Sequence, residues 1–397
     1  MKSAGAGIPK KRRFCGSWGE VARQSRCSRR GPPERLREAK KTGTHHECPS
    51  RPLSGLAFRP HPPSRSRYLK AACRTALQRG SKKILFLSRE GYLLHKLYQR
   101  MQAHVPALAD VEGRYLLASR RSMNTPAMHE LADLATVFRK PYTGSLFGLL
   151  DSRLGPDVAE AAQHALGVAA IQSEVYLPEM AGELIERLRL IAPMLKEVAQ
   201  RERTAYRLYW HTQVSDDDQP IVADIGYVGS IQSQLARVVD QPLGGAYFAV
   251  TAEIDGVLGT DQWAVARFHD GRRDSDEAPV LTYHLLLESL LTSPSGQFSH
   301  FEQHGVDLVP RYREDDEHTQ RWALIEKIQA GVEQFIEDML DVAGKHVLDA
   351  YTDPRAVQEP LNAVGAGRWQ LGAWSKSLIV DDGYTGRGHV ATAPNLA

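Results

Sequence analysis

The sequence predicts an α/β protein built on a parallel sheet, and three segments carry this prediction. Residues 83–88 and 221–224 are short apolar runs of the kind that form buried parallel strands. Each run is followed by a turn that contains glycine and then by residues with helical spacing. Residues 114–118 form a further expected strand, which completes a right-handed β-α-β unit with the first.

We therefore expect a Rossmann-like or phosphoribosyltransferase-like parallel sheet with a large helical insertion and a helical C-terminal part. Residues 126–212 have mostly helical spacing and form the expected insertion. The other expected elements are, in chain order, a helix over 68–78, a helix that begins at 92, a helix over 230–239, strands over 245–251 and 263–268, and helices over 281–291 and 321–347.

Composition divides the chain into three parts. Residues 1–67 are rich in Arg, Pro, Ser and Gly, and such a segment buries too little apolar surface to offset its chain entropy. We expect a basic disordered leader there. Residues 68–350 form the expected α/β domain. Residues 351–397 contain clusters of Pro, Gly and Asp, which predict a partly disordered tail.

Charge separates the head from the body. Residues 1–70 hold 18 of the 50 Lys and Arg residues but only 4 of the 47 Asp and Glu residues, which leaves 32 basic and 43 acidic residues in the rest. The head could also be a tail for nucleic acid or an anionic surface. We favour the leader, which includes the case of a misassigned start, because basic composition alone is weak evidence of function. Nucleic acid is therefore not the expected partner.

The cysteines indicate a reducing compartment. All four of them lie in or next to the head, so the chain after Cys73 cannot form an internal disulfide. A zinc site from Cys27, His45, His46 and Cys48 is an alternative, but these residues lack the usual ligand spacing. No run of 18 apolar residues predicts a membrane span, and residues 1–30 lack the apolar segment of a secretory signal. We expect a cytoplasmic protein.

Four polar clusters lie where the expected strands or helices end. Because the carboxyl ends of parallel strands meet at one edge of a sheet, the first three clusters should share one crevice. The clusters are Ser88-Arg89-Glu90-Gly91, Ser119-Arg120-Arg121-Ser122, the segment 224–232, and Glu288 with the serine-rich turn 293–296.

The chemistry of these clusters is that of an anion site. Glycines let a ligand approach the backbone, free N–H groups at helix starts attract anions, and arginines bind phosphate with two donors. The residues expected to bind phosphate or another part of the ligand are Ser88, Arg89, Glu90, Gly91, Ser119, Arg120, Arg121, Gly226, Gly229, Ser230 and Gln232.

Two acids are the catalytic candidates. Asp224 ends a buried strand, and Glu288 lies four positions after His284 on an expected helix. Each carboxylate is suited to act as a base, to bind sugar hydroxyls or to recruit Mg²⁺, although no defined metal site is predicted. The competing interpretation treats the arginines as solvated surface charges. Tyr227 is expected to be a packing residue with a polar tip.

The order of the clusters resembles a known bacterial group. The blocks 86–92 (FLSREGY), 115–122 (YLLASRRS) and 224–232 (DIGYVGSIQ), with Glu288, look like the C-terminal half of predicted haloacid-dehalogenase-superfamily hydrolase-like proteins from surface-polysaccharide gene clusters. This resemblance covers roughly residues 70–300 and implies partners in glycan assembly. The superfamily's Asp-x-Asp nucleophile has no counterpart here, so the resemblance concerns the half of those proteins that lacks the phosphatase centre.

A weaker resemblance is to the phosphate-binding loops of phosphoribosyltransferases. Strand, Asp224, glycine turn, Ser230 and helix follow one another as in the diphosphate loop of that family, and residues 83–92 look like its pyrophosphate loop. In the family the diphosphate loop has two adjacent acids, and here Ala223 stands in the first position. The similarity implies a sugar-phosphate ligand more directly than it implies transfer chemistry.

These observations lead to one main hypothesis and two alternatives. The main hypothesis is a domain that binds a phosphorylated sugar or a nucleotide-sugar-like ligand in bacterial polysaccharide biosynthesis, with hydrolase or transferase activity left open. The first alternative is a non-catalytic interaction module left after loss of the hydrolase half. The second is a phosphoribosyltransferase-like enzyme.

Overall fold

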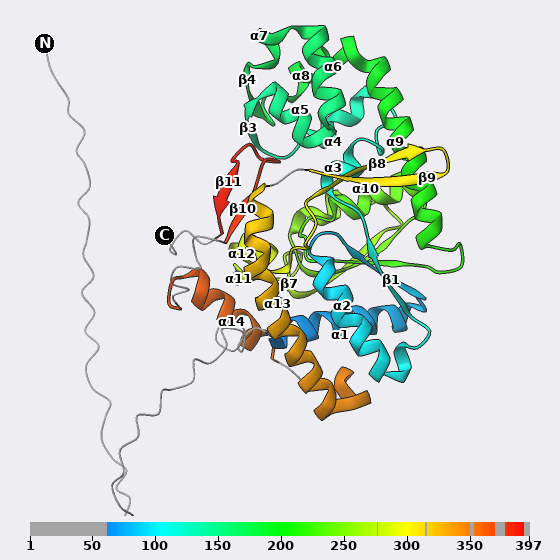
Figure 1. Cartoon of the computed structure of the whole chain (residues 1–397), viewed down its shortest axis with the longest axis vertical. Helices are drawn as coiled ribbons and strands as arrows, with labels where there is room; N and C mark the ends of the chain where they lie inside the picture. The colour runs from blue at the N-terminus through cyan, green and yellow to red at the C-terminus, as the bar shows by residue number, and fades with distance from the viewer. Residues whose placement is uncertain (1–61, 276, 314–315, 350–352, 370–377, 393–397) are drawn as a thin grey trace, which may run out of the picture. The chain divides into compact units, whose positions relative to one another are not determined.

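Five short strands form one parallel sheet, seen in Figure 1. Its strands lie in the order β2-β1-β5-β6-β7, and each neighbouring pair is parallel. The strands are β1 (Lys83–Leu87), β2 (Glu112–Leu116), β5 (Ile221–Asp224), β6 (Gly244–Val250) and β7 (Trp263–Asp270). The chain adds β2 on one side of β1 and β5 on the other, so the sheet changes direction between β1 and β5. In open α/β sheets, ligands bind at the carboxyl ends of the strands at such a switch point.

This computed structural model describes residues 62–275, 277–313, 316–349, 353–369 and 378–392. The prediction of a disordered leader falls almost entirely outside these residues. Helix α1 (Pro62–Arg79) begins six residues before the expected helix, and so includes the end of the segment that we expected to be disordered.

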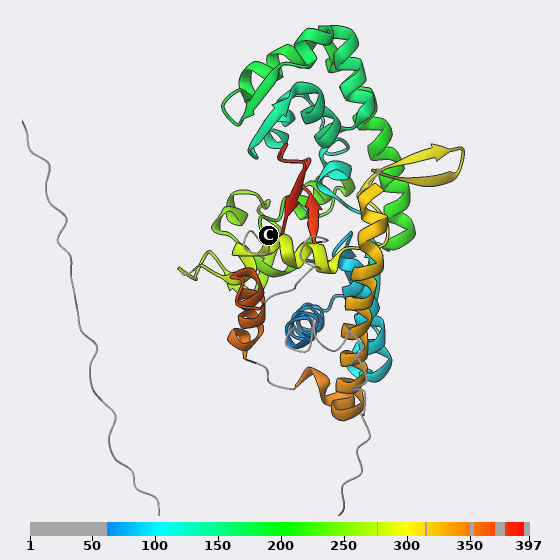
Figure 2. The same cartoon turned by 60° about the vertical axis from the view of Figure 1, so that its left-hand side comes forward.

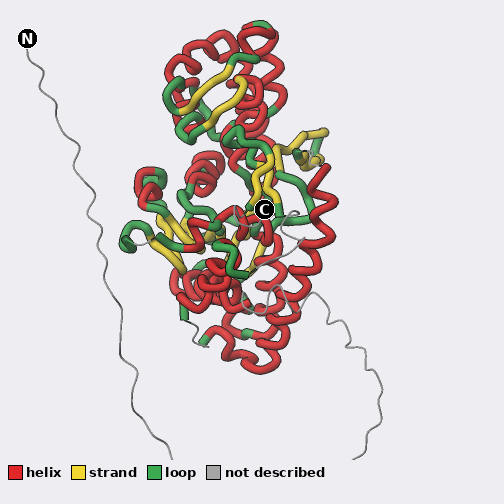
Figure 3. The backbone as a smooth tube through the Cα atoms, turned by 90° about the vertical axis from the view of Figure 1, so that its left-hand side faces the viewer, coloured by secondary structure: helices red, strands yellow, loops and turns green. Residues whose placement is uncertain are grey.

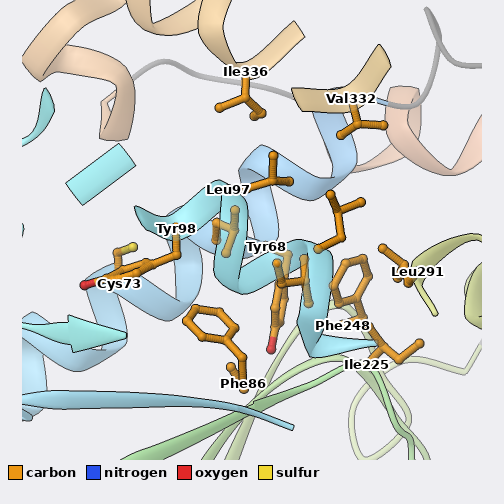
Figure 4. Packing of buried hydrophobic residues seen from close by; sticks show 14 of the residues in the cluster. Tyr68, Cys73, Phe86, Leu97, Tyr98, Ile225, Phe248, Leu291, Val332 and Ile336 are labelled. Carbon is orange, nitrogen blue, oxygen red and sulfur yellow. The ribbon is translucent and has the colours of Figure 1, made fainter. Parts of the chain in front are cut away.

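Alternating side chains of β1 divide the apolar residues between the two faces of the sheet. Ile84 and Phe86 belong to one cluster with α1, α2 (Gly91–His104), α12 (His284–Leu291) and α13 (Asp316–Ala343). Figure 4 shows part of this cluster around Phe86. Leu85 and Leu87 belong to a second cluster with α9 (Ala192–Gln213) and α10 (Ser230–Val239). Figure 3 shows helices on both sides of the strands, which buries the sheet on both faces.

The segment between β2 and β5 has a core of its own. Its apolar side chains, among them Leu146, Leu150 and Phe138, form a cluster separate from the two at the sheet. The predicted insertion is largely helical, but the structure adds an antiparallel pair of strands that the sequence did not indicate. Its elements are α3 (Arg120–Asn124), η3 (Leu131–Asp133), α4 (Leu134–Val137), β3 (Tyr142–Ser145), α5 (Leu146–Leu154), α6 (Pro156–Leu166), α7 (Val168–Ile171), β4 (Glu174–Leu177), α8 (Ala181–Arg187), η4 (Leu188–Ile191) and α9.

The C-terminal part contains regular structure that the sequence did not indicate. Within the described residues of the segment expected to be a partly disordered tail, the chain forms α14 and a β-hairpin, and the rest of that segment lies outside the described residues. The expected helix 281–291 is divided at Tyr283, whose dihedral angles are not helical. The remaining elements are η2 (Pro106–Leu108), η5 (Ala252–Gly256), α11 (Pro279–Thr282), β8 (Phe298–His304), β9 (Asp307–Tyr312), η6 (Gly344–Leu348), α14 (Pro354–Gly365), β10 (Ile379–Asp381) and β11 (His389–Ala391).

Within the described ranges, no helix combines the length and the apolar character needed to cross a membrane.

Candidate functional site

The turn after β1 brings a short polar segment to the switch point. Arg89 and Glu90 are partly buried, and the main-chain N–H of Arg89 donates to Oε2 of Glu90 at 3.1 Å. Gly91 then begins α2, and a Cβ atom at this position would lie 2.6 Å from the carbonyl carbon of Phe86. Glycine is therefore required for the close approach of α2 to the end of β1. The packing of α2 against the end of β1 fixes the position of the turn that contains Arg89 and Glu90.

The turn after β5 places Asp224 at the adjacent strand end. The main-chain N–H groups of Gly226 and Ile225 donate to its carboxylate. A Cβ atom at Gly226 would lie 2.8 Å from the carboxylate, so a larger residue would displace it. Gly229 has a left-handed conformation (φ 73°) and caps α10, which begins at Ser230. The two-glycine turn thus allows the aspartate and the helix start to lie side by side.

Glu288 and Arg120 reach the same place from other elements. Glu288 lies on α12, and Arg120 is the first residue of α3, after β2. Glu90, Asp224, Glu288 and Arg120 all act on one another electrostatically. Arg89 also acts on Glu288. The structure therefore brings three carboxylates and two guanidinium groups together at the switch point.

Asp224 and Glu288 have pKa values above those of ordinary carboxyl groups. Burial, reinforced by the carboxylate of Glu90, raises the pKa of Asp224 to about 6 although its backbone donors and Arg120 pull the pKa down. Burial and Glu90 also raise the pKa of Glu288, against the opposing effect of Arg120. Strongly shifted carboxyl groups at a strand edge are typical of sites that bind ligands or transfer protons.

Arg120 is the cation best placed for a ligand. Desolvation lowers the pKa of its guanidinium, but the nearby Glu288, Tyr384, Asp224 and Glu90 more than offset that effect and raise the pKa. Its side chain is nevertheless solvent-exposed, and it makes no ion pair with any described residue. Arg120 therefore has donors available for an anion.

Tyr227 lies beside this cluster with an unused hydroxyl. Its oxygen is buried and has no hydrogen-bond partner among the described residues. Burial and the charges of Glu288 and Asp224 raise its pKa, which keeps the hydroxyl protonated. We expected Tyr227 to be a packing residue, and its ring does pack against His284. The unpaired hydroxyl is an additional feature that the sequence did not reveal.

Two of the three serine candidates, Ser88 and Ser119, have structural partners. Ser88 donates to the carbonyl of Ala118 at 2.8 Å and accepts from its N–H, which joins the ends of β1 and β2. Ser119 caps α3 by accepting from the N–H of Ser122, and it donates to the carbonyl of Phe298 at 2.7 Å. Both hydroxyls are buried, so their role in the structure is to position the turns.

Two other candidates, Arg121 and Gln232, are buried and form hydrogen bonds within the protein. Arg121 is buried and donates to both carboxylate oxygens of Glu202 at 2.8 Å. The amide nitrogen of Gln232 donates to the carbonyls of Leu243 and Trp263, and its oxygen accepts from Tyr247. We therefore leave Arg121 and Gln232 out of the candidate site. The sequence could not reveal these partners, because they lie far along the chain or in the next strand.

Metal-binding clusters are absent from the part of the chain that the structure describes. Among those residues, no group of three or more His, Cys, Asp or Glu side chains is arranged to hold a metal ion. Asp224 and Glu288 remain the acids with the chemistry to attract Mg²⁺.

A cavity of about 320 Å³ lies away from the predicted residues, between α1 and the strands β6 and β7. Lys70, Arg74 and Arg267 contribute to its lining. Tyr68 lines it too, and its hydroxyl donates to the carbonyl of Ala246 at 2.6 Å. The same hydroxyl also lies 3.1 Å from the main-chain oxygen of Asp224, and this contact relates the cavity to the candidate site.

Comparison with known proteins does not add a family. No protein-family model matches the sequence, and a search of curated proteins also finds no match.

Proposed function

We propose that this chain binds a phosphorylated sugar or a nucleotide-sugar-like ligand at the switch point between β1 and β5. The observation that carries the proposal is the exposed guanidinium of Arg120, which makes no ion pair with any described residue and lies beside the carboxyl groups of Asp224 and Glu288, whose pKa values are raised. A phosphorylated sugar has an anionic end and a hydroxyl-bearing end, and this cluster contains groups for both.

The phosphate would lie on the cationic side of the cluster. Arg120 and Arg89 supply the positive charge. The starts of α2 at Gly91 and of α10 at Ser230 follow the two strand ends that flank the switch point. Their free N–H groups favour an anion, and the helix dipoles add to the attraction.

The sugar would lie on the carboxylate side. Ionised carboxylates accept hydrogen bonds from hydroxyl groups, and protonated ones donate to ring or bridging oxygens. Asp224, with a pKa of about 6, is mostly ionised at pH 7, whereas the raised pKa of Glu288 favours its protonated form. An ionised acid beside a protonated one is the arrangement that general acid–base catalysis needs. Hydrolase or transferase chemistry on the bound sugar phosphate would use Asp224 as base and Glu288 as acid.

The biological setting follows from the sequence resemblance. The blocks 86–92, 115–122 and 224–232 are similar to those of hydrolase-like proteins from bacterial surface-polysaccharide gene clusters. Two of these blocks contain the strand ends that flank the switch point. We therefore propose a role in glycan assembly.

Binding can be tested by calorimetric titration of the full chain. The ligands would be glucose 1-phosphate, UDP-glucose and phosphoribosyl diphosphate, each with and without Mg²⁺. We expect at least one to bind, and Asp224→Asn to weaken that binding at least tenfold, because a charged hydrogen bond is worth about 1.5–3 kcal/mol.

Asp240→Asn is the matched control. Asp240 is exposed and has a left-handed conformation that asparagine also accepts, so this change should leave affinity unaltered. If none of the three ligands binds, the sugar-phosphate proposal is refuted, and the interaction-module alternative becomes the better hypothesis. Binding of phosphoribosyl diphosphate alone would instead favour the phosphoribosyltransferase-like alternative.

A further inference from the structure

The hairpin β10–β11 bridges the insertion and the candidate site. The main-chain N–H of Thr143, on β3, donates to the carbonyl of Thr385 in the hairpin turn at 3.3 Å. A Cβ atom at Gly386 would lie 2.1 Å from the carbonyl oxygen of Thr143, so the two backbones are in close contact. Figures 1 and 2 show the hairpin, in red, beside the insertion and near α12.

A fully buried arginine fixes the hairpin turn. Arg153, on α5, donates from Nε and Nη2 to the carbonyl of Tyr384 at 3.2 and 3.0 Å. Its remaining hydrogen bonds go to the carbonyls of Val137, Lys140 and Pro141. Burial lowers the pKa of Arg153, and no carboxylate forms an ion pair with it among the described residues. A buried guanidinium paired only with carbonyls is costly, so these contacts indicate a fixed position for Tyr384.

The ring of Tyr384 reaches the site itself. The guanidinium of Arg120 lies 5.4 Å from the ring centroid, within the range of a cation–π contact. The guanidinium of Arg153 lies 4.5 Å from the same ring. The hydroxyl of Tyr384 accepts a hydrogen bond from Asn124 on α3 at 3.3 Å. The ring is thus held by α5 and α3 while it contacts the one arginine of the site that has no ion pair among the described residues.

We infer that Tyr384 is a positioning residue that holds Arg120 toward the carboxylate cluster and completes the anion-binding side of the site. The contact restricts a long, exposed side chain that has no ion-pair partner to fix it among the described residues. Preorganised donors bind an anion more tightly because less side-chain entropy is lost on binding. The ligand-binding part of this inference rests on the proposed function, and the position of Arg120 does not.

The position of Arg120 can be measured without a ligand. In the full chain, the reaction of Arg120 with the arginine reagent phenylglyoxal can be followed by peptide mass spectrometry. Tyr384→Leu removes the ring and should raise the reaction rate about three- to tenfold, as expected for loss of a cation–π contact. Tyr384→Phe keeps the ring and should restore a rate close to that of the wild type. Arg189, which is exposed in the insertion, serves as the internal reference.

Ligand binding is then measured on the same variants. Tyr384→Leu should weaken the binding of glucose 1-phosphate, UDP-glucose or phosphoribosyl diphosphate about three- to tenfold, and Tyr384→Phe should not. In an Arg120→Gln background, Tyr384→Leu should have no further effect. Tyr176→Leu, an exposed tyrosine on β4, controls for the loss of a surface ring.

The outcomes separate the two proposals. An unchanged Arg120 reaction rate in Tyr384→Leu, with circular dichroism confirming the fold, overturns the positioning role even if a ligand binds. A raised rate together with unaltered affinity for a ligand that binds also overturns it, because the contact would then be purely structural. If no ligand binds the wild type, the proposed function fails, while the reaction rates still decide whether Tyr384 fixes Arg120.

Discussion

Arg120 and Arg121 are adjacent in the chain, yet they belong to regions with opposite electrostatics. Arg121 lies between α3 and α9, where its guanidinium donates two hydrogen bonds to the carboxylate of Glu202. Arg120 faces the switch point, where it makes no ion pair among the described residues and lies among three carboxylates. The first region has one buried charge of each sign. The second has an excess of acids.

The difference indicates where function is to be sought. A buried pair with matched charges is already neutralised, so it has no net charge to offer a ligand, although the buried Nε of Arg121 has no hydrogen-bond partner among the described residues. A cluster with unequal charges remains unsatisfied until a proton, a cation or a ligand balances it, and it is maintained at a cost in stability. Substitutions that change the charge balance or a helix cap in each region therefore test this contrast.

The largest expected effect is at the matched pair. Glu202→Gln leaves the guanidinium of Arg121 buried and uncompensated, so the free energy of unfolding should fall by about 3–5 kcal/mol. Urea denaturation at pH 7 measures this change. Glu186→Gln removes the acid of a solvent-exposed pair with Arg189 and should change the free energy of unfolding far less than Glu202→Gln does.

A double variant sharpens the same test. Arg121→Met with Glu202→Leu replaces both charges by apolar side chains, and stability should return to within about 1–2 kcal/mol of the wild type. Equal losses in the single and double variants would show that packing volume, and not charge balance, governs this junction.

The neighbouring arginines also mark the limit of sequence reasoning. Strand 221–224 and helix 230–239 coincide with their predicted bounds, because an apolar run and a two-glycine turn are local signals. The convergence of the strand ends on one edge likewise follows from parallel topology. Arg121 differs from Arg120 because it pairs with Glu202 on α9, and no local sequence pattern indicates that contact.

The C-terminal hairpin was missed for a related reason. Its glycine-rich composition is typical of disorder when the segment is considered alone. The hairpin is instead held by hydrogen bonds from Arg153 and Thr143, both in the insertion. Tyr384 therefore could not be predicted as a neighbour of the site, since its position is set by tertiary contacts over more than 200 residues of chain.

The second prediction concerns the unmatched region and its dependence on pH. The pKa of Asp224 rises from 3.8 to about 6 on folding, so the folded protein holds this proton more tightly than the unfolded chain does. The stability that protonated Asp224 contributes is therefore complete below pH 3.8 and is lost as the pH rises through about 6. A shift of this size corresponds to roughly 3 kcal/mol, which partial exposure reduces to about 1–2 kcal/mol.

In Asp224→Asn the side chain at this position carries no charge at any pH, so the loss of stability with rising pH should be absent. At pH 8 the variant should be more stable than the wild type by about 1–2 kcal/mol, and the difference should shrink below pH 5. Urea denaturation at both pH values gives the comparison, with Asp240→Asn as the isosteric control. A variant less stable than the wild type at pH 8 would show that the carboxylate of Asp224 is well satisfied, which removes the contrast between the two regions.

The smallest expected effect is at Ser119, which precedes Arg120 and Arg121. It distinguishes a residue that caps a helix from one that contacts the ligand. The hydroxyl of Ser119 accepts from Ser122 and donates to Phe298, so it has no proton left for a phosphate. Ser119→Ala should therefore lower the free energy of unfolding by about 1 kcal/mol and leave ligand affinity unchanged. Ser145, which caps α5 inside the insertion, is the matched control, and its change to alanine should have the same two results.

The two serine variants are compared by urea denaturation and by titration with whichever sugar phosphate binds the wild type. Loss of affinity in Ser119→Ala but not in Ser145→Ala, at equal stability, would place Ser119 among the ligand contacts. The unmatched region would then extend beyond Arg120 to the whole start of α3. Equal behaviour of the two variants would confine the unmatched region at this turn to Arg120, which lies near the acids and makes no ion pair with the described residues.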